Sequence, residues 1–447
     1  MFSKILIANR GEIAVRIIRA CKEMGIATVA VFSEADREAL HVSLADESYC
    51  IGRAAVSESY LNMRAILTVA SSCNAEAIHP GYGLLSENAE FVGLCDECGI
   101  LFIGPSAKVI AKMGDKDEAR RTVKTAGVPI ISGSDIIGDI ESGLEIAADI
   151  GYPVMLKARS GGGGRGIRII NDADEFANAY NSAVFEAVSA FGDGAVYMEK
   201  YLYPVKHVEV QIMCDNHGNR VCLGDRDCSI QRKNQKLLEE SPACISESMR
   251  GSMHADALKI AAAVDYRGVG TIEFLVTGDG KYYFMEMNTR LQVEHSVTEM
   301  ATGIDIVKWQ IRIAADSVLD IVSDVNRNGH AIECRIIAEN PMQNFRPNCG
   351  EVTLLHIPGG HFVRFDTALY QNYFIPPYYD SMIGKLIVGA GTREEAVRKM
   401  RGALSELVIE GIYHNSELQI EILSDDEFIG GGYTTDFLVR KGYVSDK

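Results

Sequence analysis

Short apolar runs alternate with an amphipathic stretch over residues 3–110. Runs with the length and composition of buried strands occupy 4–9, 27–36, 75–83 and 99–105. Between the first two runs, apolar residues recur at helical spacing at Ile13, Ile17, Ala20, Cys21 and Met24. This alternation predicts a doubly wound parallel sheet of the α/β class, with ligand loops at the carboxyl ends of its strands. The segments at those ends are Asn9-Arg10-Gly11, Asp36 and the turn 79–83.

Two further regions follow with different patterns. One begins near Asp115 and runs to about residue 318, with glycine and proline at its internal joints. The other begins near residue 330 with short strand patterns and continues into an amphipathic helix, whose apolar face holds Ala396, Met400, Ala403, Leu404 and Leu407. We therefore expect three domains, at 1–113, 114–318 and 330–447. The last is expected to be a smaller α+β domain that closes on the second, and a segment at about 130–203 is expected to be a mobile lid.

The chain is acidic, with 44 Lys and Arg residues against 61 Asp and Glu residues and a net charge of −17 over 447 residues. Such a surface repels nucleic acids and anionic lipids, so neither is expected as a partner. No apolar run is long enough to span a bilayer, and the short run after Met1 is not a secretory signal. The eleven cysteines are scattered, and Cys95 and Cys98 form the only C-x-x-C pair. These features predict a protein of the reducing cytoplasm.

The segment 152–170 contains four consecutive glycines and a G-x-G-x-x-G pattern, made by Gly161, Gly163 and Gly166. A dinucleotide-binding fold requires a helix after these glycines, whereas the β-like residues 167–170 follow here. The segment therefore predicts a strand, a glycine loop and a second strand, with backbone N–H groups free to bind phosphate. Lys157 and Arg165 add positive charge. A purely structural hairpin is the alternative, but four glycines would cost it conformational order.

The segment 270–295 predicts a β-hairpin that pairs two carboxylates. Asp279-Gly280 is typical of a two-residue type I′ turn. In the register of that turn Glu273 lies directly opposite Glu286, in apolar surroundings where the two charges repel. A divalent cation would reverse the repulsion, and oxygen ligands suit Mg²⁺ or Mn²⁺. The predicted ligands are Glu273, Glu286 and Asn288; an exposed acidic patch is the alternative.

Two further segments concentrate charge: 224–242 and the run that ends at His295. The first holds four cations, Arg226, Arg232, Lys233 and Lys236. They form either a solvated basic face or an anion-binding patch. In the second, Arg290 and Gln292 precede Glu294, which suits an anion clamp beside a general base. His295 is the alternative base, although a lone histidine is more often structural.

Taken together, these segments resemble the ATP-grasp superfamily and, within it, biotin carboxylase. The resemblance covers the whole chain and depends on ordered segments: ANRGEIAVRI (8–17), HPGYGLLSEN (79–88), MGDK (113–116), the glycine loop, RDCSIQR (226–232), MEMNTRLQVEH (285–295), HAIECRIIAE (330–339) and PPYYDSMIGKL (376–386). As an ordered set they are highly specific. The resemblance implies an N-terminal biotin carboxylase domain, a central ATP-grasp domain with a mobile lid and a C-terminal biotin carboxylase domain.

The resemblance also implies roles for individual residues. ATP would be held by Lys116, Lys157, Gly161, Gly162, Gly163, Gly164, Arg165, Gly166, Glu199, Lys200, Leu202, His207, Gln231 and Asn234. Two Mg²⁺ or Mn²⁺ ions would be bound by Glu273, Glu286 and Asn288. Bicarbonate would be bound by Lys236, Arg290, Gln292, Val293 and Glu294. Biotin would be bound by Tyr82, Gly83 and Arg335. The catalytic residues would be Glu294, Arg335, Lys236 and Arg290.

The implied reaction is the ATP-dependent carboxylation of biotin. Glu294 would deprotonate bicarbonate for attack on the γ-phosphate of ATP, and the carboxyphosphate formed would break down to CO₂ and phosphate. Phosphate would take the N1 proton of biotin, and Arg335 would stabilise the enolate oxygen.

The resemblance implies a biotin carboxyl carrier protein and carboxyltransferase subunits as partners, and a homodimer. The sequence contains no Ala-Met-Lys-Met attachment motif. We therefore expect the separate biotin carboxylase subunit of an acetyl-CoA carboxylase, which begins fatty-acid synthesis. A subunit of a pyruvate or other acyl-CoA carboxylase is the alternative.

Four positions depart from the family pattern. Asn234 stands where a histidine near the ribose is common, and Arg159-Ser160 stand where small residues are common. Ser296 replaces a common proline, and His361 stands where some members have an aromatic residue at the dimer contact. The other residues of that contact are retained: Arg19, Glu23 and Arg364.

Two other functions stay open at this point. Another ATP-grasp ligase, such as a carboxylate–amine ligase, is disfavoured by Arg335 and the segment 376–386. A catalytically silent ATP-binding regulatory subunit is disfavoured by Lys236 and Glu294. Stimulation of ATP hydrolysis by free biotin would exclude both.

Overall fold

The N-terminal region forms a five-stranded parallel sheet in the structure, a computed structural model that describes residues 1–159, 167–321, 325 and 329–444. Its strands lie in the order β3 (Glu47–Gly52), β2 (Ala27–Ser33), β1 (Lys4–Ile7), β4 (Ala77–His79) and β5 (Leu101–Phe102). All four neighbouring pairs are parallel, which confirms the predicted doubly wound sheet. The sequence did not predict β3, because this edge strand is largely exposed and lacks an apolar run. The order in which successive strands join the sheet reverses between β1 and β4, where ligand loops are expected.

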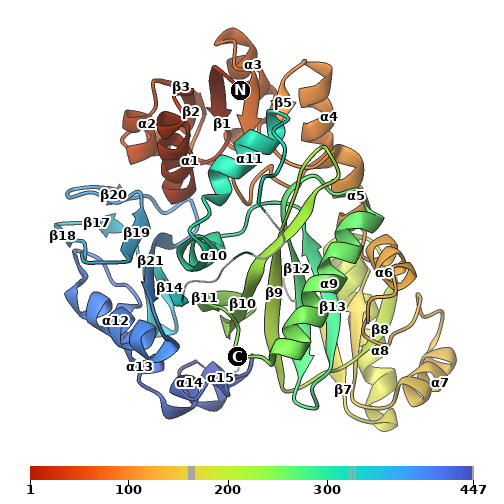
Figure 1. The fold of residues 1–447 in the computed structure, drawn as a ribbon. Helices are drawn as coiled ribbons and strands as arrows, with labels where there is room; N and C mark the ends of the chain where they lie inside the picture. The colour runs from red at the N-terminus through yellow and green to blue at the C-terminus, as the bar shows by residue number, and fades with distance from the viewer. Residues whose placement is uncertain (160–166, 322–324, 326–328, 445–447) are drawn as a thin grey trace.

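Helices cover both faces of this sheet (Figure 1). They are α1 (Gly11–Glu23), α2 (Leu40–Leu44), α3 (Met63–Ser72), α4 (Ala89–Glu97) and α5 (Ala107–Gly114). Helix α1 buries the predicted apolar stripe, with Ile13, Ile17 and Cys21 no more than 2% exposed. The eleven cysteines all lie within the described residues, and none forms a disulfide.

An eight-stranded sheet runs through the central and C-terminal regions. Its order is β13 (Tyr282–Asn288), β12 (Gly268–Thr277), β9 (Val205–Cys214), β10 (Arg220–Arg232), β11 (Gln235–Ser241), β14 (His330–Ile337), β21 (Met382–Ala390) and β19 (Val363–Thr367). The C-terminal strands share this sheet with the central region: β14 pairs with β11, so that β14, β21 and β19 extend the sheet. The physical reason is that β11 would otherwise present an unpaired edge. The domain bounds at 114–318 and 330–447 stay a prediction.

A smaller three-stranded sheet lies apart from the central one, at the lower right of Figure 1. Its order is β7 (Ile167–Ile170), β6 (Val154–Ala158) and β8 (Val196–Lys200), packed with α7 (Ile140–Ile150) and α8 (Ala173–Phe191). It has its own core around Leu156, Phe176 and Met198. The predicted strands on both sides of the glycine loop are therefore confirmed. The loop itself, with Gly161, Gly162, Gly163, Gly164, Arg165 and Gly166, lies outside the described residues.

The hairpin β12–β13 pairs Glu273 with Glu286, as predicted, but its turn differs from the prediction. Thr277 rather than Gly278 faces Lys281, which makes a three-residue loop. Gly280 ends this loop at φ +80, the left-handed conformation that such loops require. A bulge between Phe274 and Glu273 then shifts the register by one residue and restores the carboxylate pair.

The remaining helices flank the eight-stranded sheet. They are α6 (Lys116–Thr125), α9 (Glu247–Ala263), α10 (His295–Thr302), α11 (Ile306–Ala314), α12 (Arg393–Glu406), α13 (Ser416–Ile422), α14 (Asp426–Ile429) and α15 (Phe437–Arg440). The predicted face at Ala396, Met400, Ala403, Leu404 and Leu407 is buried. None of the helices among the described residues has both the length and the apolar character needed to cross a bilayer.

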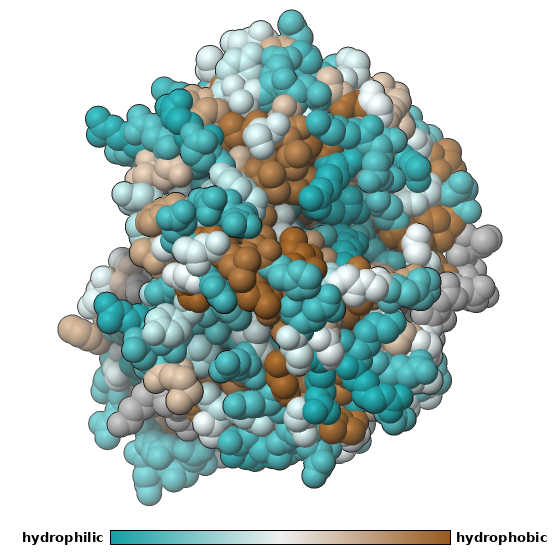
Figure 2. Space-filling view, turned by 90° about the vertical axis from the view of Figure 1, so that its left-hand side faces the viewer, coloured by the Kyte–Doolittle hydropathy of each residue, from teal (hydrophilic) through white to brown (hydrophobic). Residues whose placement is uncertain are grey.

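Short strand pairs border the C-terminal end of this sheet. They are formed by β15 (Glu339–Asn340) with β16 (Arg346–Pro347), β17 (Gly350–Glu351) with β20 (Phe374–Ile375), and β18 (Leu354–His356) with β22 (Val408–Glu410). Figure 2 shows this side of the molecule, where hydrophobic residues gather in separate patches among hydrophilic ones.

Candidate active site

Lys236, on β11, is the centre of a buried cluster of carboxylates. Its Nζ atom lies 2.6 Å from Glu209, 3.1 Å from Glu273 and 2.5 Å from Glu294. All three carboxylates are no more than 3% exposed. Carboxylates this close repel one another unless a cation lies between them, so the cluster depends on Lys236. The structure thus brings the predicted residues Lys236, Glu273 and Glu294 into one site and adds Glu209, which the sequence did not reveal.

Arg335, on β14, joins the C-terminal strands to this cluster. Its guanidinium group lies 3.0 Å from Glu294 and 2.5 Å from Glu239 on β11. Burial raises the pKa of Glu239 to about 7, and Arg335 limits that rise. Because two carboxylates hold the guanidinium group, its orientation is fixed. A fixed cation in this position could stabilise an anion beside Glu294.

Arg226 lies fully buried beneath the cluster and orients Gln292. It donates to Glu209 at 2.5 Å, to Gln211 at 2.7 Å and to Gln292 at 2.8 Å. Gln292 donates in turn to Glu273 at 2.7 Å, so both ends of its amide are engaged. The sequence placed Arg226 in a basic segment but did not show whether it was solvated. Arg226 lies in the buried middle of β10, which is 13 residues long. A long strand pattern around Arg226 was therefore the signal that could have indicated a buried cation.

Arg290 connects the site to the N-terminal region. Its Nε atom donates to Glu87 at 2.7 Å, and its Nη2 atom donates to the side-chain oxygen of Asn288 at 2.9 Å. Glu87 also accepts the backbone N–H of Thr289 at 3.0 Å. Glu87 belongs to a quoted motif but was not assigned a role, because its partner lies 203 residues further along the chain.

Glu294 is better suited than His295 to accept a proton. Burial would raise the pKa of Glu294, but Lys236, Arg335 and Arg226 lower it below its ordinary value, so the side chain is ionised at neutral pH. His295 is fully buried, and its Nδ1 atom lies 2.8 Å from the Gln292 carbonyl oxygen. Burial and nearby cations hold the pKa of His295 well below its ordinary value. It is therefore a neutral histidine within the core, in agreement with a structural role.

The opposed pair Glu273 and Glu286 fits a divalent cation. Asn288 donates to Glu273 at 2.9 Å, so all three predicted ligands lie together. Glu286 makes no hydrogen bond or ion pair to any described residue, which leaves its oxygens available. We expected both carboxylates to be buried. Glu273 is buried, but Glu286 is exposed to solvent. Partial loss of water and then repulsion by Glu273 raise the pKa of Glu286.

Several of the residues predicted to hold ATP form two groups. In the first, Lys157 and Arg120 both contact the buried Glu199, and Lys200 donates to the carbonyls of Gly151 and Tyr152 at 2.8 and 2.9 Å. In the second, the side chain of Gln231 lies 2.7 Å from Nδ1 of His207. The Nε2 atom of His207 lies 2.9 Å from Glu273, which connects this group to the carboxylate cluster.

Three other predicted nucleotide-binding residues are exposed or half-buried. Lys116 is the exposed first residue of α6, and Leu202 is half-buried after β8. Asn234 is exposed in the turn between β10 and β11. Lys233 and Asn234 have φ values of +48 and +63 in this two-residue turn. A type I′ turn favours asparagine, which gives a conformational reason for the residue at this position.

Tyr82 and Gly83 lie in the turn after β4, next to the loop after β1. The side chain of Asn9 donates to the carbonyls of Pro80 and Tyr82 at 2.6 and 2.8 Å, and the Tyr82 hydroxyl donates to Glu12 on α1. A Cβ atom at Gly81 would lie 2.9 Å from Nδ2 of Asn9, so this approach requires glycine. The two predicted ligand loops therefore form one packed unit.

The remaining departures from the family pattern have local partners, apart from Ser160, which lies outside the described residues. Arg159 donates to Asp193 at 2.9 Å, and Ser296 donates to Glu333 at 2.6 Å. His361 is exposed and packs against the exposed ring of Phe362, with ring centres 4.1 Å apart. The other expected dimer residues are an exposed Arg19, Glu23 paired with Lys308, and Arg364 paired with Asp366 and Glu299.

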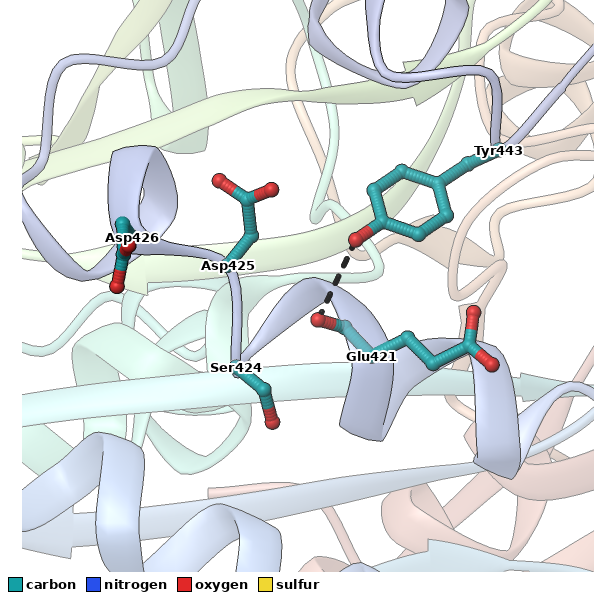
Figure 3. Close-up of a pocket in the computed structure, with 5 residues that line it drawn as sticks. All are labelled: Glu421, Ser424, Asp425, Asp426 and Tyr443. Atoms are coloured by element: carbon teal, nitrogen blue, oxygen red, sulfur yellow. Dashed lines mark hydrogen bonds between the residues drawn. The ribbon is translucent and has the colours of Figure 1, made fainter.

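Figure 3 shows a pocket elsewhere in the C-terminal region, which is less suited to bind phosphate or bicarbonate. Its lining residues are Glu421, Ser424, Asp425, Asp426 and Tyr443. The carboxylates would repel phosphate and bicarbonate. The cluster around Lys236 therefore remains the candidate site.

Three family models together match most of the chain. Residues 1–110 match the biotin carboxylase N-terminal domain, and residues 115–322 match the ATP-binding domain of the carbamoyl-phosphate synthase L chain. Residues 333–440 match the biotin carboxylase C-terminal domain.

Similar proteins cover nearly the whole chain. Biotin carboxylase 1 of Bacillus subtilis is 53% identical over 442 residues, 98% of each chain. A pyruvate carboxylase subunit of Methanothermobacter thermautotrophicus is 50% identical over 98% of this chain and 90% of its own. The biotin carboxylase domain dimer of Hydrogenobacter thermophilus 2-oxoglutarate carboxylase, solved with MgADP, ADP and bicarbonate, has a TM-score of 0.93. It is 49% identical and covers 100% of this chain and 99% of that chain.

Proposed function

The chain belongs to the biotin carboxylase family, and we propose that its buried cluster of Lys236, Glu294 and Arg335 carries out the ATP-dependent carboxylation of biotin by bicarbonate. The enzyme is a ligase that forms a carbon–nitrogen bond. The observation that carries the proposal is one ionised carboxylate, Glu294, held between a lysine and an arginine from two different strands. This arrangement gives a base and two anion-binding cations within contact distance of one another.

The proposed reaction has two stages. Glu294 accepts the bicarbonate proton, a bicarbonate oxygen attacks the γ-phosphorus of ATP, and ADP leaves, which forms carboxyphosphate. Carboxyphosphate breaks its C–O bond to give CO₂ and phosphate, and phosphate takes the N1 proton of biotin. The N1 nitrogen then bonds to the carbon of CO₂, and Arg335 stabilises the negative charge on the biotin oxygen before that bond forms.

The chain's residues would divide the binding between them. Lys236, Arg290, Gln292 and the Val293 backbone would hold bicarbonate beside Glu294. Tyr82, Gly83 and Arg335 would hold biotin. The nucleotide would lie between the two sheets, held by Lys116, Lys157, the segment 161–166, Glu199, Lys200, Leu202, His207, Gln231 and Asn234.

The donor set of Glu273, Glu286 and Asn288 fits two Mg²⁺ or Mn²⁺ ions with ATP. Oxygen ligands at an opposed, mutually repelling carboxylate pair favour such cations. When bound, the ions neutralise charge on the phosphates and orient them. Asn288 and Gln292, which both donate to Glu273, would fix the orientation of its carboxylate.

The biotin acceptor is proposed to be attached to a carboxyl carrier protein, with separate carboxyltransferase subunits, and the chain is proposed to form a homodimer. The final acceptor proposed is acetyl-CoA. A pyruvate or other carboxylase subunit is the second candidate, since the similar proteins include pyruvate and 2-oxoglutarate carboxylase subunits. Co-purification of the native protein with its transferase would separate the two.

The experiment that tests the function measures ATP hydrolysis by the purified chain. We expect hydrolysis to require bicarbonate and to accelerate with free biotin. A carboxylate–amine ligase or a silent regulatory subunit would not respond in this way. Hydrolysis that is indifferent to both compounds would reject the assignment.

A further inference from the structure

Lys385, on β21, is a fully buried lysine to which the sequence gave no role. Its Nζ atom donates to the Val293 carbonyl at 2.6 Å and to the Ser296 hydroxyl at 2.9 Å, and lies 3.5 Å from the Glu12 carboxylate. Glu12 belongs to the N-terminal region, Val293 and Ser296 to the central region and Lys385 to the C-terminal region. One ammonium group therefore contacts all three regions.

Two of these contacts lead directly to the proposed substrate sites. The Val293 carbonyl is part of the peptide group that also contains the nitrogen of Glu294. Because a peptide group is planar, holding this oxygen fixes the plane from which the base extends. On the other side, Glu12 accepts the hydroxyl proton of Tyr82. Lys385 thus holds both the bicarbonate loop, residues 291–296, and the carboxylate that orients the biotin turn, residues 80–84.

Neighbouring carboxylates keep Lys385 protonated. Burial would lower its pKa, but the carboxylates of Glu12, Glu333 and Asp366 raise it above the ordinary value. An ammonium group has three donor hydrogens, and two of them are used by Val293 and Ser296. Removing this cation would leave the buried carboxylate of Glu12 without its ion-pair partner, whereas Asp366 would stay paired with Arg364.

Ser296 strengthens this arrangement in a way that a proline at the same position would not allow. Its oxygen accepts from Lys385, and its hydroxyl donates to Glu333 at 2.6 Å. Glu333 lies two residues before Arg335 on β14. The serine therefore links the lysine to the strand that carries the proposed biotin-binding arginine.

We propose that Lys385 is a positioning residue that aligns the bicarbonate loop with the biotin turn across the three regions of the chain. Carboxyl transfer requires donor and acceptor to be held in a narrow range of distance and orientation. A single buried cation that is bonded directly to the bicarbonate loop, and connected to the biotin turn through Glu12, meets this requirement. The inference rests on the proposed function.

The test compares substrate dependence in Lys385→Met, in the double variant Lys385→Met with Glu12→Gln, and in Lys385→Arg. The double variant removes one negative charge together with the cation. We expect the KM for bicarbonate and the KM for biotin both to rise by about tenfold or more in the methionine variants, with little change in the KM for ATP. Arginine keeps the charge and should have a smaller effect in the same direction.

Arg393→Met is the matched control. Arg393 is also a cation of the C-terminal region, and it is paired with the buried Glu240 on β11 at 2.8 Å, but it contacts neither substrate loop. Its KM values should match those of the wild type. A purely structural role for Lys385 would lower the active fraction, and hence kcat, and leave both KM values unchanged.

Hydrogen exchange gives a readout without turnover. In Lys385→Met, segments 80–84 and 291–296 should both exchange faster, whereas Arg393→Met should leave both at the wild-type rate. If the methionine variants do not fold, Ser296→Ala keeps the charge and removes one partner, and both KM values should still rise. Unchanged KM values in folded variants, beside a wild type that responds to bicarbonate and biotin, would overturn this inference alone. A wild type that responds to neither would overturn the proposed function as well.

Discussion

Glu273 on β12 and Glu286 on β13 face each other across neighbouring antiparallel strands, although one of them is buried and the other is accessible. Only Glu273 is compensated: Lys236 and His207 hold its pKa well below the ordinary value despite burial. Glu286 has no such partner among the described residues, and its pKa is raised. The pair therefore carries an uncompensated charge on one side, where a cation would bind.

Glu286→Gln should separate stability from activity. A carboxyl group whose pKa is raised by folding destabilises the folded state once the pH exceeds the ordinary pKa of the group. Removal of this carboxyl group should therefore leave the melting temperature without metal unchanged or higher at pH 7 to 8. Activity should fall strongly and recover in part with excess Mg²⁺ or Mn²⁺. Glu406→Gln, at an exposed ion pair, is the control for charge removal. A variant that is less stable and insensitive to metal would contradict the cation site.

Glu294→Gln tests the base. Glutamine keeps the size of the side chain but cannot accept the proton, so kcat should fall by about 10²–10⁴-fold with a small effect on ATP affinity. Glu239→Gln removes the other carboxylate on Arg335 and should cause a smaller loss. Normal turnover by Glu294→Gln would assign the proton transfer to another group, with His295 the next candidate to test.

Closure of the proposed lid should be visible by hydrogen exchange. With Mg²⁺ and nucleotide, the segment 157–170 should exchange more slowly, because phosphates would engage its backbone and Lys157. Peptides from α12, which packs on the far part of the eight-stranded sheet, serve as an internal control. An unchanged rate at saturating nucleotide would count against a closing loop.

Glu240→Gln tests a structural carboxylate between β11 and the C-terminal helices. Burial would raise its pKa, but His330 and Arg393 lower it from 4.5 to about 2. A carboxylate whose pKa is lowered by folding stabilises the folded state at pH values above the ordinary pKa of the group. This stabilisation is lost as the pH falls towards 2. The free energy of unfolding at pH 7 should therefore fall by up to about 3 kcal/mol. Urea titrations at pH 7 and pH 4 should show the difference from wild type shrinking at the lower pH; an equal difference at both would contradict the ionic role.

The hairpin shows how a sequence can predict a contact through an incomplete argument. Asp279-Gly280 correctly indicated a tight connection between two strands, but the loop has three residues rather than two. The bulge opposite Glu273 and Phe274, where Met285 is the extra residue of β13, compensated for that error. No local pattern in the sequence predicts this bulge. The pair Glu273 and Glu286 is therefore confirmed, while the register argument that led to it was wrong at the turn.

Other parts of the fold depended on distant partners. The N-terminal alternation predicted its own sheet, because each apolar run is buried on both faces. The attachment of β14 to β11 could not be read in the same way, since strand pairing over about a hundred residues has no periodic signal. Glu87, Glu209 and Lys385 were missed for the same reason: each acts through a partner that is close only after folding.

Oxygen transfer from bicarbonate tests the proposed chemistry most directly. With ¹⁸O-labelled bicarbonate, ATP, Mg²⁺ and free biotin, in an assay shorter than isotopic exchange with water, the oxygen that attacks the γ-phosphorus stays on phosphate when carboxyphosphate breaks down. Mass spectrometry of the released phosphate should therefore find one ¹⁸O atom per molecule. Unlabelled phosphate, released at the same rate, would contradict activation of bicarbonate by ATP at this site.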